Sequence, residues 1–229
     1  MREITDESVV CDRSRPERTH HVHVEPPFDE ALYRWEQNYF FENCLGGTFA
    51  AQVSAERIAA LAAQPVWESI RRELAARPRV LVHRDFQSQN VMIHDGRAGL
   101  IDFQGLRPGL AHYDLASLLF DPRDSRAQLA RSERSELLDF YRGLGLRPDL
   151  GRDEADFMRI LRLSAVQRMM QALGTYGFLP LKRGRTEFQK FVPGILANLR
   201  DTVALVPELA AFGGILAPLR AESPEALEQ

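Results

Sequence analysis

The hydrophobic positions that follow residue 28 recur every three or four residues, which is the spacing of one face of an α-helix. Leu32, Trp35 and Tyr39 form this first stripe, and Gly46-Gly47 supplies a stop after it. Because a helix in a globular domain turns its apolar stripe inward, we expect these three side chains to face the core.

Two more helices are predicted before residue 79. Ser54 is a favoured N-cap residue, and Ile58 and Leu61 follow it on one helix face. Pro65 suits the first turn of the next helix, and Pro78 ends that helix. The apolar stripe of the helix that begins at Pro65 consists of Trp67, Ile70 and Leu74.

The centre of the chain has a different period. Residues 79–83, 90–94 and 98–102 are short apolar runs with β-branched members, and such runs are typical of strands. Asp95-Gly96 lies between the second and third runs and is a favoured two-residue hairpin turn. We therefore expect a small antiparallel β element built from three short strands.

The C-terminal half returns to helical spacing. Helices are predicted at residues 112–121, 132–145, 153–174 and roughly 186–204, and the third has an apolar face made of Phe157, Ile160, Leu161 and Met169. The fold class is therefore mainly α with a small antiparallel β element, an α+β arrangement. Residues 1–27 are polar and close on two prolines, so we expect a tail or linker there, a folded domain over 28–204 and a C-terminal extension over 205–229.

Composition excludes several classes of protein. A chain of 229 residues with 45% hydrophobic side chains can bury a core. Its formal net charge of -3 provides no excess positive field for a nucleic-acid partner. No apolar run approaches the roughly 18 to 20 residues of a membrane span, and the polar N-terminus does not resemble a secretory signal. The two cysteines, Cys11 and Cys44, lack metal-site spacing, so we expect a reduced, cytoplasmic protein without a membrane partner.

The central strands carry the candidate chemistry. Asp85 follows the first strand, Asn90 lies five positions later, and Asp102 ends the third strand. An aspartate can accept a proton from a hydroxyl, while an amide oxygen and a second carboxylate suit Mg²⁺. One base and two metal-holding groups are the minimum set for phosphoryl transfer. Each aspartate alone would fit an ordinary turn, so the argument depends on the set.

Two segments resemble a known family. "HRDFQSQN", residues 83–90, resembles the catalytic loop of the kinase-like superfamily, and "IDFQ", residues 101–104, resembles its metal-binding aspartate segment. The glutamine of "IDFQ", the short interval between the segments and "GLAHYDLASLLFDP" downstream look most like the aminoglycoside/choline phosphotransferase branch. Within that branch they are similar to bacterial kinases that phosphorylate the anomeric hydroxyl of cell-wall amino sugars (N-acetylmuramate and N-acetylglucosamine). "VQRMMQALGTYGFL", residues 166–179, resembles the helix that follows in those kinases.

The resemblance implies an ATP- and Mg-dependent phosphotransferase that acts on a hydroxyl of a small molecule, with a cell-wall amino sugar as the favoured substrate. Asp85 would be the catalytic base, and Asn90 and Asp102 would hold the magnesium ion.

The same resemblance assigns supporting residues. Asp114 would brace the catalytic loop by accepting backbone N–H bonds. His83 and Arg84 would shape that loop, and Gln87 and Gln104 would lie near the substrate.

One part of the family pattern is missing from the sequence. The family's smaller lobe normally supplies a glycine-rich turn and a strand lysine for the ATP phosphates. No lysine precedes Asp85, and the glycines before it are Gly46 and Gly47. We therefore expect a protein-kinase-like large lobe without its small nucleotide lobe, and an apolar face covered by the tail, by a second copy in a homodimer or by a separate small-lobe protein. Three explanations stay open: a fragment, a split enzyme, or a degenerate, non-catalytic binding module that keeps the substrate groove.

Overall fold

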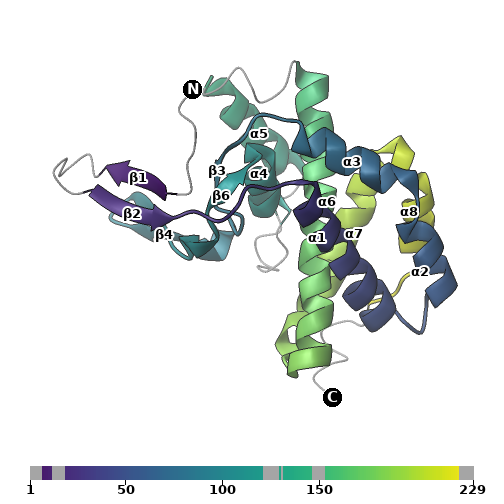
Figure 1. Ribbon diagram of the computed structural model, residues 1–229. Helices are drawn as coiled ribbons and strands as arrows, with labels where there is room; N and C mark the ends of the chain where they lie inside the picture. Colours follow the sequence, from purple (N-terminus) through teal and green to yellow (C-terminus); the bar gives the residue numbers. More distant parts are fainter. Residues whose placement is uncertain (1–6, 12–18, 121–128, 130, 146–152, 222–229) are drawn as a thin grey trace.

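The computed structural model describes residues 7–11, 19–120, 129, 131–145 and 153–221, and this part of the chain is mainly α-helical (Figure 1). Helix α6 (Glu154–Arg183) is the central element, with helices on both sides of it. The others are α1 (Glu30–Phe40), α2 (Ala55–Ala62), α3 (Pro65–Ala75), α4 (Ala111–Leu119), α5 (Arg131–Gly143), α7 (Val192–Val203) and α8 (Ala210–Leu216). No described helix combines the length and the hydropathy needed to cross a membrane.

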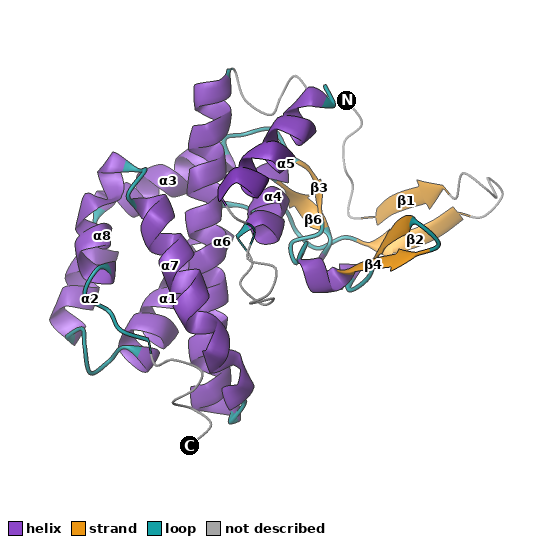
Figure 2. Cartoon of the chain, turned by 180° about the vertical axis from the view of Figure 1, so that it is seen from behind, coloured by secondary structure: helices purple, strands orange, loops and turns teal. Residues whose placement is uncertain are grey.

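The described strands form three separate antiparallel pairs, gathered at one end of the molecule (Figure 2). They are β1 (Glu7–Cys11) with β2 (Thr19–His23), β3 (Val80–Val82) with β6 (Arg107–Gly109), and β4 (Val91–His94) with β5 (Arg97–Leu100). The predicted β4–β5 hairpin is confirmed, with Asp95 and Gly96 at φ 47° and 70°. The prediction of one three-stranded element is wrong, because β3 pairs with β6 and not with the hairpin.

The start of the chain contacts the domain more closely than a free tail would. The described part of residues 1–79 contains the strands β1 and β2, and the N–H of Glu25 then donates to the carbonyl of Leu106 at 2.8 Å. The N–H of Phe28 donates to the carbonyl of Pro108 at 2.9 Å, and the Phe28 ring is fully buried. Residues 24–28 are therefore fixed along β6, beside the candidate site.

Several predicted helix ends are confirmed. The Ser54 side chain caps α2 by accepting a hydrogen bond from the N–H of Arg57, and α3 begins at Pro65. Helix α6 extends beyond its predicted end at residue 174 and closes at Gly184, which has φ 67°. Residues 186–191 form a 3₁₀ segment, so α7 begins at Val192, later than predicted.

The predicted apolar stripe of α1 is wrong in its phase. The Trp35 side chain is 49% exposed, while Tyr33, Glu36 and Phe40 are fully buried. The error arises because the buried face includes a carboxylate, which hydrophobic spacing does not count as core. Gly46-Gly47 also fails to stop the helix, since a π-helical segment, Phe41–Thr48, continues α1 through both glycines.

The backbones of α1 and α6 pack closely against each other at two glycines of α6. A Cβ at Gly174 would lie 2.7 Å from Cδ1 of Tyr39, and a Cβ at Gly177 would lie 2.1 Å from the carbonyl oxygen of Asn43. The glycines therefore let the two backbones approach closely. This approach aligns the side chains of α1 with those of α6 next to the loop that follows β3.

Candidate active site

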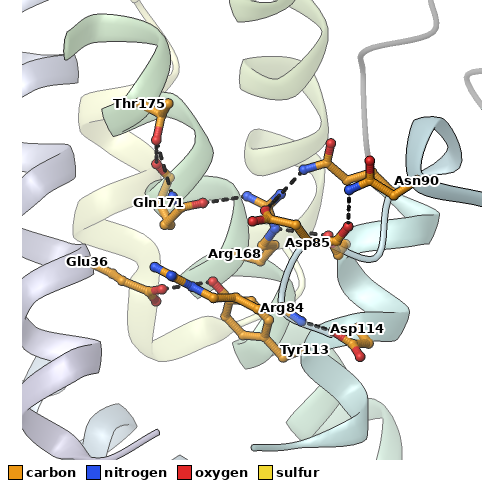
Figure 3. Close-up of polar contacts among 11 residues, drawn as sticks. Glu36, Arg84, Asp85, Asn90, Tyr113, Asp114, Arg168, Gln171 and Thr175 are labelled. Carbon is orange, nitrogen blue, oxygen red and sulfur yellow. Dashed lines mark hydrogen bonds and ion pairs between the residues drawn. The ribbon is translucent and has the colours of Figure 1, made fainter. Parts of the chain in front are cut away.

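The loop after β3 is held by one buried carboxylate. Oδ2 of Asp114 accepts a hydrogen bond from the N–H of His83 at 2.7 Å, and Oδ1 accepts one from the N–H of Arg84 at 2.9 Å (Figure 3). Arg84 adopts a left-handed conformation with φ 74°, which is unfavourable for a residue with a Cβ. The two bonds from α4 stabilise this turn, and the turn sets the position of Asp85.

Burial dominates the electrostatics of the bracing carboxylate. It raises the pKa of Asp114 to about 6, although the hydrogen bonds from the backbone N–H groups of His83 and Arg84 lower it. A carboxylate in this position is most effective as an acceptor when it is ionised. Ionisation of Asp114 therefore strengthens the two hydrogen bonds to the loop, while burial of the charge opposes ionisation.

A pH dependence of stability follows from Asp114. The pKa of Asp114 in the folded protein, about 6, lies above the ordinary value of 3.8, so the folded protein binds this proton more tightly than the unfolded chain between about pH 4 and pH 6. The contribution of Asp114 to the free energy of unfolding should therefore fall as the pH rises through this window. Urea unfolding of the wild type and Asp114→Asn, measured at several pH values, should give a difference that changes between pH 4 and 6. A constant difference would contradict the assignment.

Asp85 presents a half-exposed carboxylate at the tip of the loop. Its side chain is 45% exposed, and Oδ1 accepts hydrogen bonds from Nη2 of Arg168 and Nε2 of Gln87, both at 3.3 Å. Nδ2 of Asn90 donates to the Asp85 carbonyl at 2.8 Å, which closes the loop across five residues. The carboxylate is therefore oriented from one side and open to solvent on the other.

Arg168 was missed by the sequence reasoning. It extends from α6 with a side chain 7% exposed, and it also donates to Oγ of Ser117 at 3.1 Å and to Oε1 of Gln171 at 2.6 Å (Figure 3). Its place in a long predicted helix beside Val166, Met169 and Met170 was the available signal, because a buried cation needs a partner. The contact with Asp85 makes Arg168 a positioning residue for the carboxylate.

The second aspartate segment lies against the first. Nε2 of His83 lies 2.9 Å from the carbonyl oxygen of Ile101, and the N–H of Ile101 donates to the carbonyl of Asn90 at 3.1 Å. Asp102 follows in a left-handed conformation, φ 64°, with an exposed side chain. The structure therefore fixes the loop of Asn90 next to the segment of Asp102.

The donor set fits magnesium. The Asn90 amide uses its nitrogen for the Asp85 carbonyl, which leaves its oxygen as an acceptor, and Asp102 adds an exposed carboxylate. In the part of the chain that the structure describes, no three His, Cys, Asp or Glu side chains form a metal cage. Mg²⁺ typically takes one or two protein oxygens and completes its shell with water and substrate phosphates. Asn90 and Asp102 are suited to that mode of binding.

The two glutamines contact aspartates. Nε2 of Gln87 donates to Asp85, and Nε2 of Gln104 donates to Asp102, each from two positions further along the chain. Gln87 is fully buried, and its Oε1 has no hydrogen-bond partner within the described residues. Both glutamines thus support the acidic side chains, and their predicted place near the substrate stays a prediction.

A buried polar cluster under the loop was also missed. Glu36 of α1 is fully buried and accepts hydrogen bonds from the Tyr113 hydroxyl at 2.9 Å and from Nε2 of Gln167 at 3.0 Å. Burial raises the pKa of Glu36, while these hydrogen bonds and the charges of Arg84 and Arg168 lower it. Figure 3 shows the Arg84 side chain extending toward Glu36. The cluster joins α1, α4 and α6 beneath the loop that carries Asp85.

Apolar side chains are exposed beside the site. Five of them on and after the β4–β5 hairpin have exposed fractions between 46% and 69%: Met92, Ile93, Leu100, Ile101 and Phe103. A groove of about 530 Å³ lies nearby, lined mainly by apolar side chains and by His83 and Asp114. This agrees with the expected apolar face, and an occupant that covers it stays a prediction.

Comparisons with known proteins agree with the motifs. The model of the phosphotransferase enzyme family matches residues 17–147. The chain is 29% identical over 202 residues to the N-acetylmuramate/N-acetylglucosamine kinase of Pseudomonas aeruginosa and 30% identical over 203 residues to that of Pseudomonas putida. Each match covers 86% of this chain and 57% of the relative. The kinase of the same name from Neisseria meningitidis is 33% identical over 150 residues, 64% of this chain and 43% of the relative.

These matches also bear on the extent of the chain. It spans about 57% of the length of the Pseudomonas relatives. The family match begins at residue 17, inside the segment predicted to be a tail. The division into a tail over 1–27, a domain over 28–204 and an extension over 205–229 stays a prediction.

Proposed function

The chain belongs to the phosphotransferase enzyme family, and we propose that it carries the catalytic groups of an ATP-dependent kinase acting on a hydroxyl of a small molecule. One observation carries the proposal: the Asp85 carboxylate is half exposed at the tip of a loop that Asp114 and Asn90 hold in shape. A general base must be both oriented and reachable, and Asp85 meets both conditions.

The mechanism follows from the chain's own groups. The oxygen of the acceptor hydroxyl attacks the γ-phosphorus of ATP while Asp85 accepts the hydroxyl proton. The bond between the γ-phosphorus and the oxygen that bridges it to the β-phosphate breaks, and ADP leaves. Arg168 orients the base through its contact at 3.3 Å. Asn90 and Asp102 would hold Mg²⁺, which neutralises phosphate charge when it is bound.

The relatives support an amino sugar as the acceptor. Three of them are named N-acetylmuramate/N-acetylglucosamine kinase, so we propose a cell-wall amino sugar as the substrate of this chain. The alternative, a non-catalytic binding module, is motivated by the lack of a lysine before Asp85. The position of Asp85, Asn90 and Asp102 on adjoining segments favours the kinase over that alternative.

A phosphoryl-transfer assay tests the proposal. The chain, with Mg²⁺ and labelled ATP, is incubated with N-acetylglucosamine, N-acetylmuramate, an aminoglycoside or choline, alone and with a candidate nucleotide-lobe protein. We expect label on the amino sugars and none on the aminoglycoside or choline. Absence of label from every acceptor in every combination would refute the proposed function.

A further inference from the structure

One face of α6 runs from the candidate base along the helix. Arg168, Gln171 and Thr175 are spaced by three and four residues, so they share this face. Nη1 of Arg168 donates to Oε1 of Gln171 at 2.6 Å, and Nε2 of Gln171 donates to Oγ1 of Thr175 at 3.2 Å (Figure 3). Since Arg168 also contacts Asp85, this polar row begins at the candidate base.

Two aromatic rings of α1 lie beside the polar row. Tyr39 lies against α6 at Gly174, where burial raises the pKa of its hydroxyl and the neighbouring Thr175 side chain acts in the opposite direction. The Trp35 and Tyr39 rings stack with their centroids 4.9 Å apart and their planes at 13°. The Trp35 side chain is 49% exposed even though it stacks on Tyr39.

The hydrogen bonds between the helices fix the direction of this surface. Gln167 contacts Tyr33 and Glu36 in the first half of α1. Gly174 lies against Tyr39 near the end of α1, and Gly177 lies against Asn43 just beyond it. The two helices therefore run in the same direction, and Trp35 lies closer than Tyr39 to the end of the row where Arg168 meets Asp85. The row from Arg168 to Thr175 is about 10 Å long at 1.5 Å per residue, the size of one substituted monosaccharide.

We propose that the acceptor sugar binds on this surface, which we call the sugar platform: Trp35 and Tyr39 together with Arg168, Gln171 and Thr175. This inference rests on the proposed function and adds the place of the acceptor. A pyranose ring has an apolar C–H face and a polar rim, so its face would lie on the exposed indole and its rim would meet the polar row. The reacting hydroxyl would then point toward Asp85.

The chemistry of the platform favours a sugar over a protein partner. An exposed aromatic pair alone could serve either ligand. Here the pair borders a row of amide and hydroxyl groups that is joined by hydrogen bonds to Arg168, which contacts the candidate base. Gln171 and Thr175 offer both donors and acceptors, as the hydroxyls and the acetamido group of an amino sugar require.

Tryptophan fluorescence tests the platform without relying on turnover. The chain has two tryptophans, and Trp67 is 2% exposed in the core with its indole N–H bonded to the carbonyl of Leu61. Acrylamide should therefore quench mainly Trp35 in the wild type, and N-acetylglucosamine should protect Trp35 from quenching. Trp35→Phe, which keeps Trp67, should show no sugar-dependent change.

Truncation tests the contribution of the ring. Trp35→Ala should raise the dissociation constant and the KM for the sugar about tenfold and leave kcat within about twofold, because the ring binds the acceptor without touching the reacting atoms. Phe140→Ala is the matched control, since Phe140 is an exposed aromatic residue, 67% exposed, on α5. The control should leave all three constants unchanged.

The outcomes separate this inference from the proposed function. Transfer to an amino sugar without protection of Trp35, or with an unchanged KM in Trp35→Ala, would overturn the platform and leave the kinase assignment intact. A chain that neither binds nor phosphorylates any amino sugar would overturn both. Circular dichroism of Trp35→Ala and Trp35→Phe controls for folding, and the quenching of the wild type needs no variant.

Discussion

Asp85→Asn should lower kcat for phosphoryl transfer by about a thousandfold, within the range for removal of a general base. The substitution keeps the shape of the side chain and removes its ability to take up a proton. Asp85 is 45% exposed, and an asparagine oxygen can still accept the hydrogen bond from Arg168, so the free energy of unfolding should change little. Steady-state kinetics and urea unfolding of the same preparation measure both effects.

The response of Asp102→Asn to Mg²⁺ distinguishes a metal ligand from a general base. If Asp102 holds Mg²⁺, the variant should recover part of its activity at high Mg²⁺ concentration, because weaker binding can be offset by mass action. Asp85→Asn should not recover, since magnesium does not replace a proton acceptor. Rescue of Asp85→Asn by Mg²⁺, or activity within tenfold of the wild type, would rule out the role of base.

The parts of the site that the sequence predicted are local ones. Asp85 and Asn90 lie five positions apart, and the β4–β5 hairpin brings Asp102 back to the same region through a two-residue turn. Motif spacing and turn chemistry act over a few residues, so a sequence carries them directly. The bracing contact of Asp114 could be predicted only from the family resemblance. Asp114 belongs to α4, which is 31 positions away from the loop in the sequence.

The parts that were missed depend on packing between distant segments. Arg168 reaches Asp85 across 83 positions of the sequence, and Gln167 reaches Glu36 across 131. Hydrophobic spacing treats buried polar residues as surface, which also explains why the predicted stripe of α1 chose Trp35 instead of Glu36. Such residues become core only when hydrogen-bond partners from another element satisfy them.

The pairing of β3 with β6 also depends on contacts between distant segments that the sequence does not reveal. The segment Arg107–Gly109 has no β-branched residue and contains a proline, so no propensity rule predicts β6. It is ordered by its neighbours: β3 pairs with one edge, and residues 25–28 donate two backbone hydrogen bonds to Leu106 and Pro108. A strand that depends on tertiary contacts is visible only in the fold.

The crossing of α1 and α6 leads to a prediction about stability. Gly177→Ala should lower the free energy of unfolding by about 3 kcal/mol, at the upper end of ordinary overpacking, because its Cβ would lie 2.1 Å from the Asn43 carbonyl oxygen. That atom belongs to the backbone, so no side-chain rotation relieves the clash. Urea unfolding measures the change, and Gly214→Ala in α8 is the control because no atom lies within 4 Å of its added Cβ.

The same substitution should affect the site through the position of α1. Relief of the clash requires α1 to move away from α6, and that movement would lengthen the hydrogen bond of 3.0 Å between Gln167 and Glu36 and separate Tyr39 from Thr175. Gly177→Ala should therefore also weaken binding of the amino sugar. Gly214→Ala should lower neither property, and it should raise the free energy of unfolding slightly, because alanine favours a helix and meets no neighbour there. If Gly177→Ala has the same free energy of unfolding as the wild type, α6 does not approach the backbone at Asn43 as closely as the structure shows.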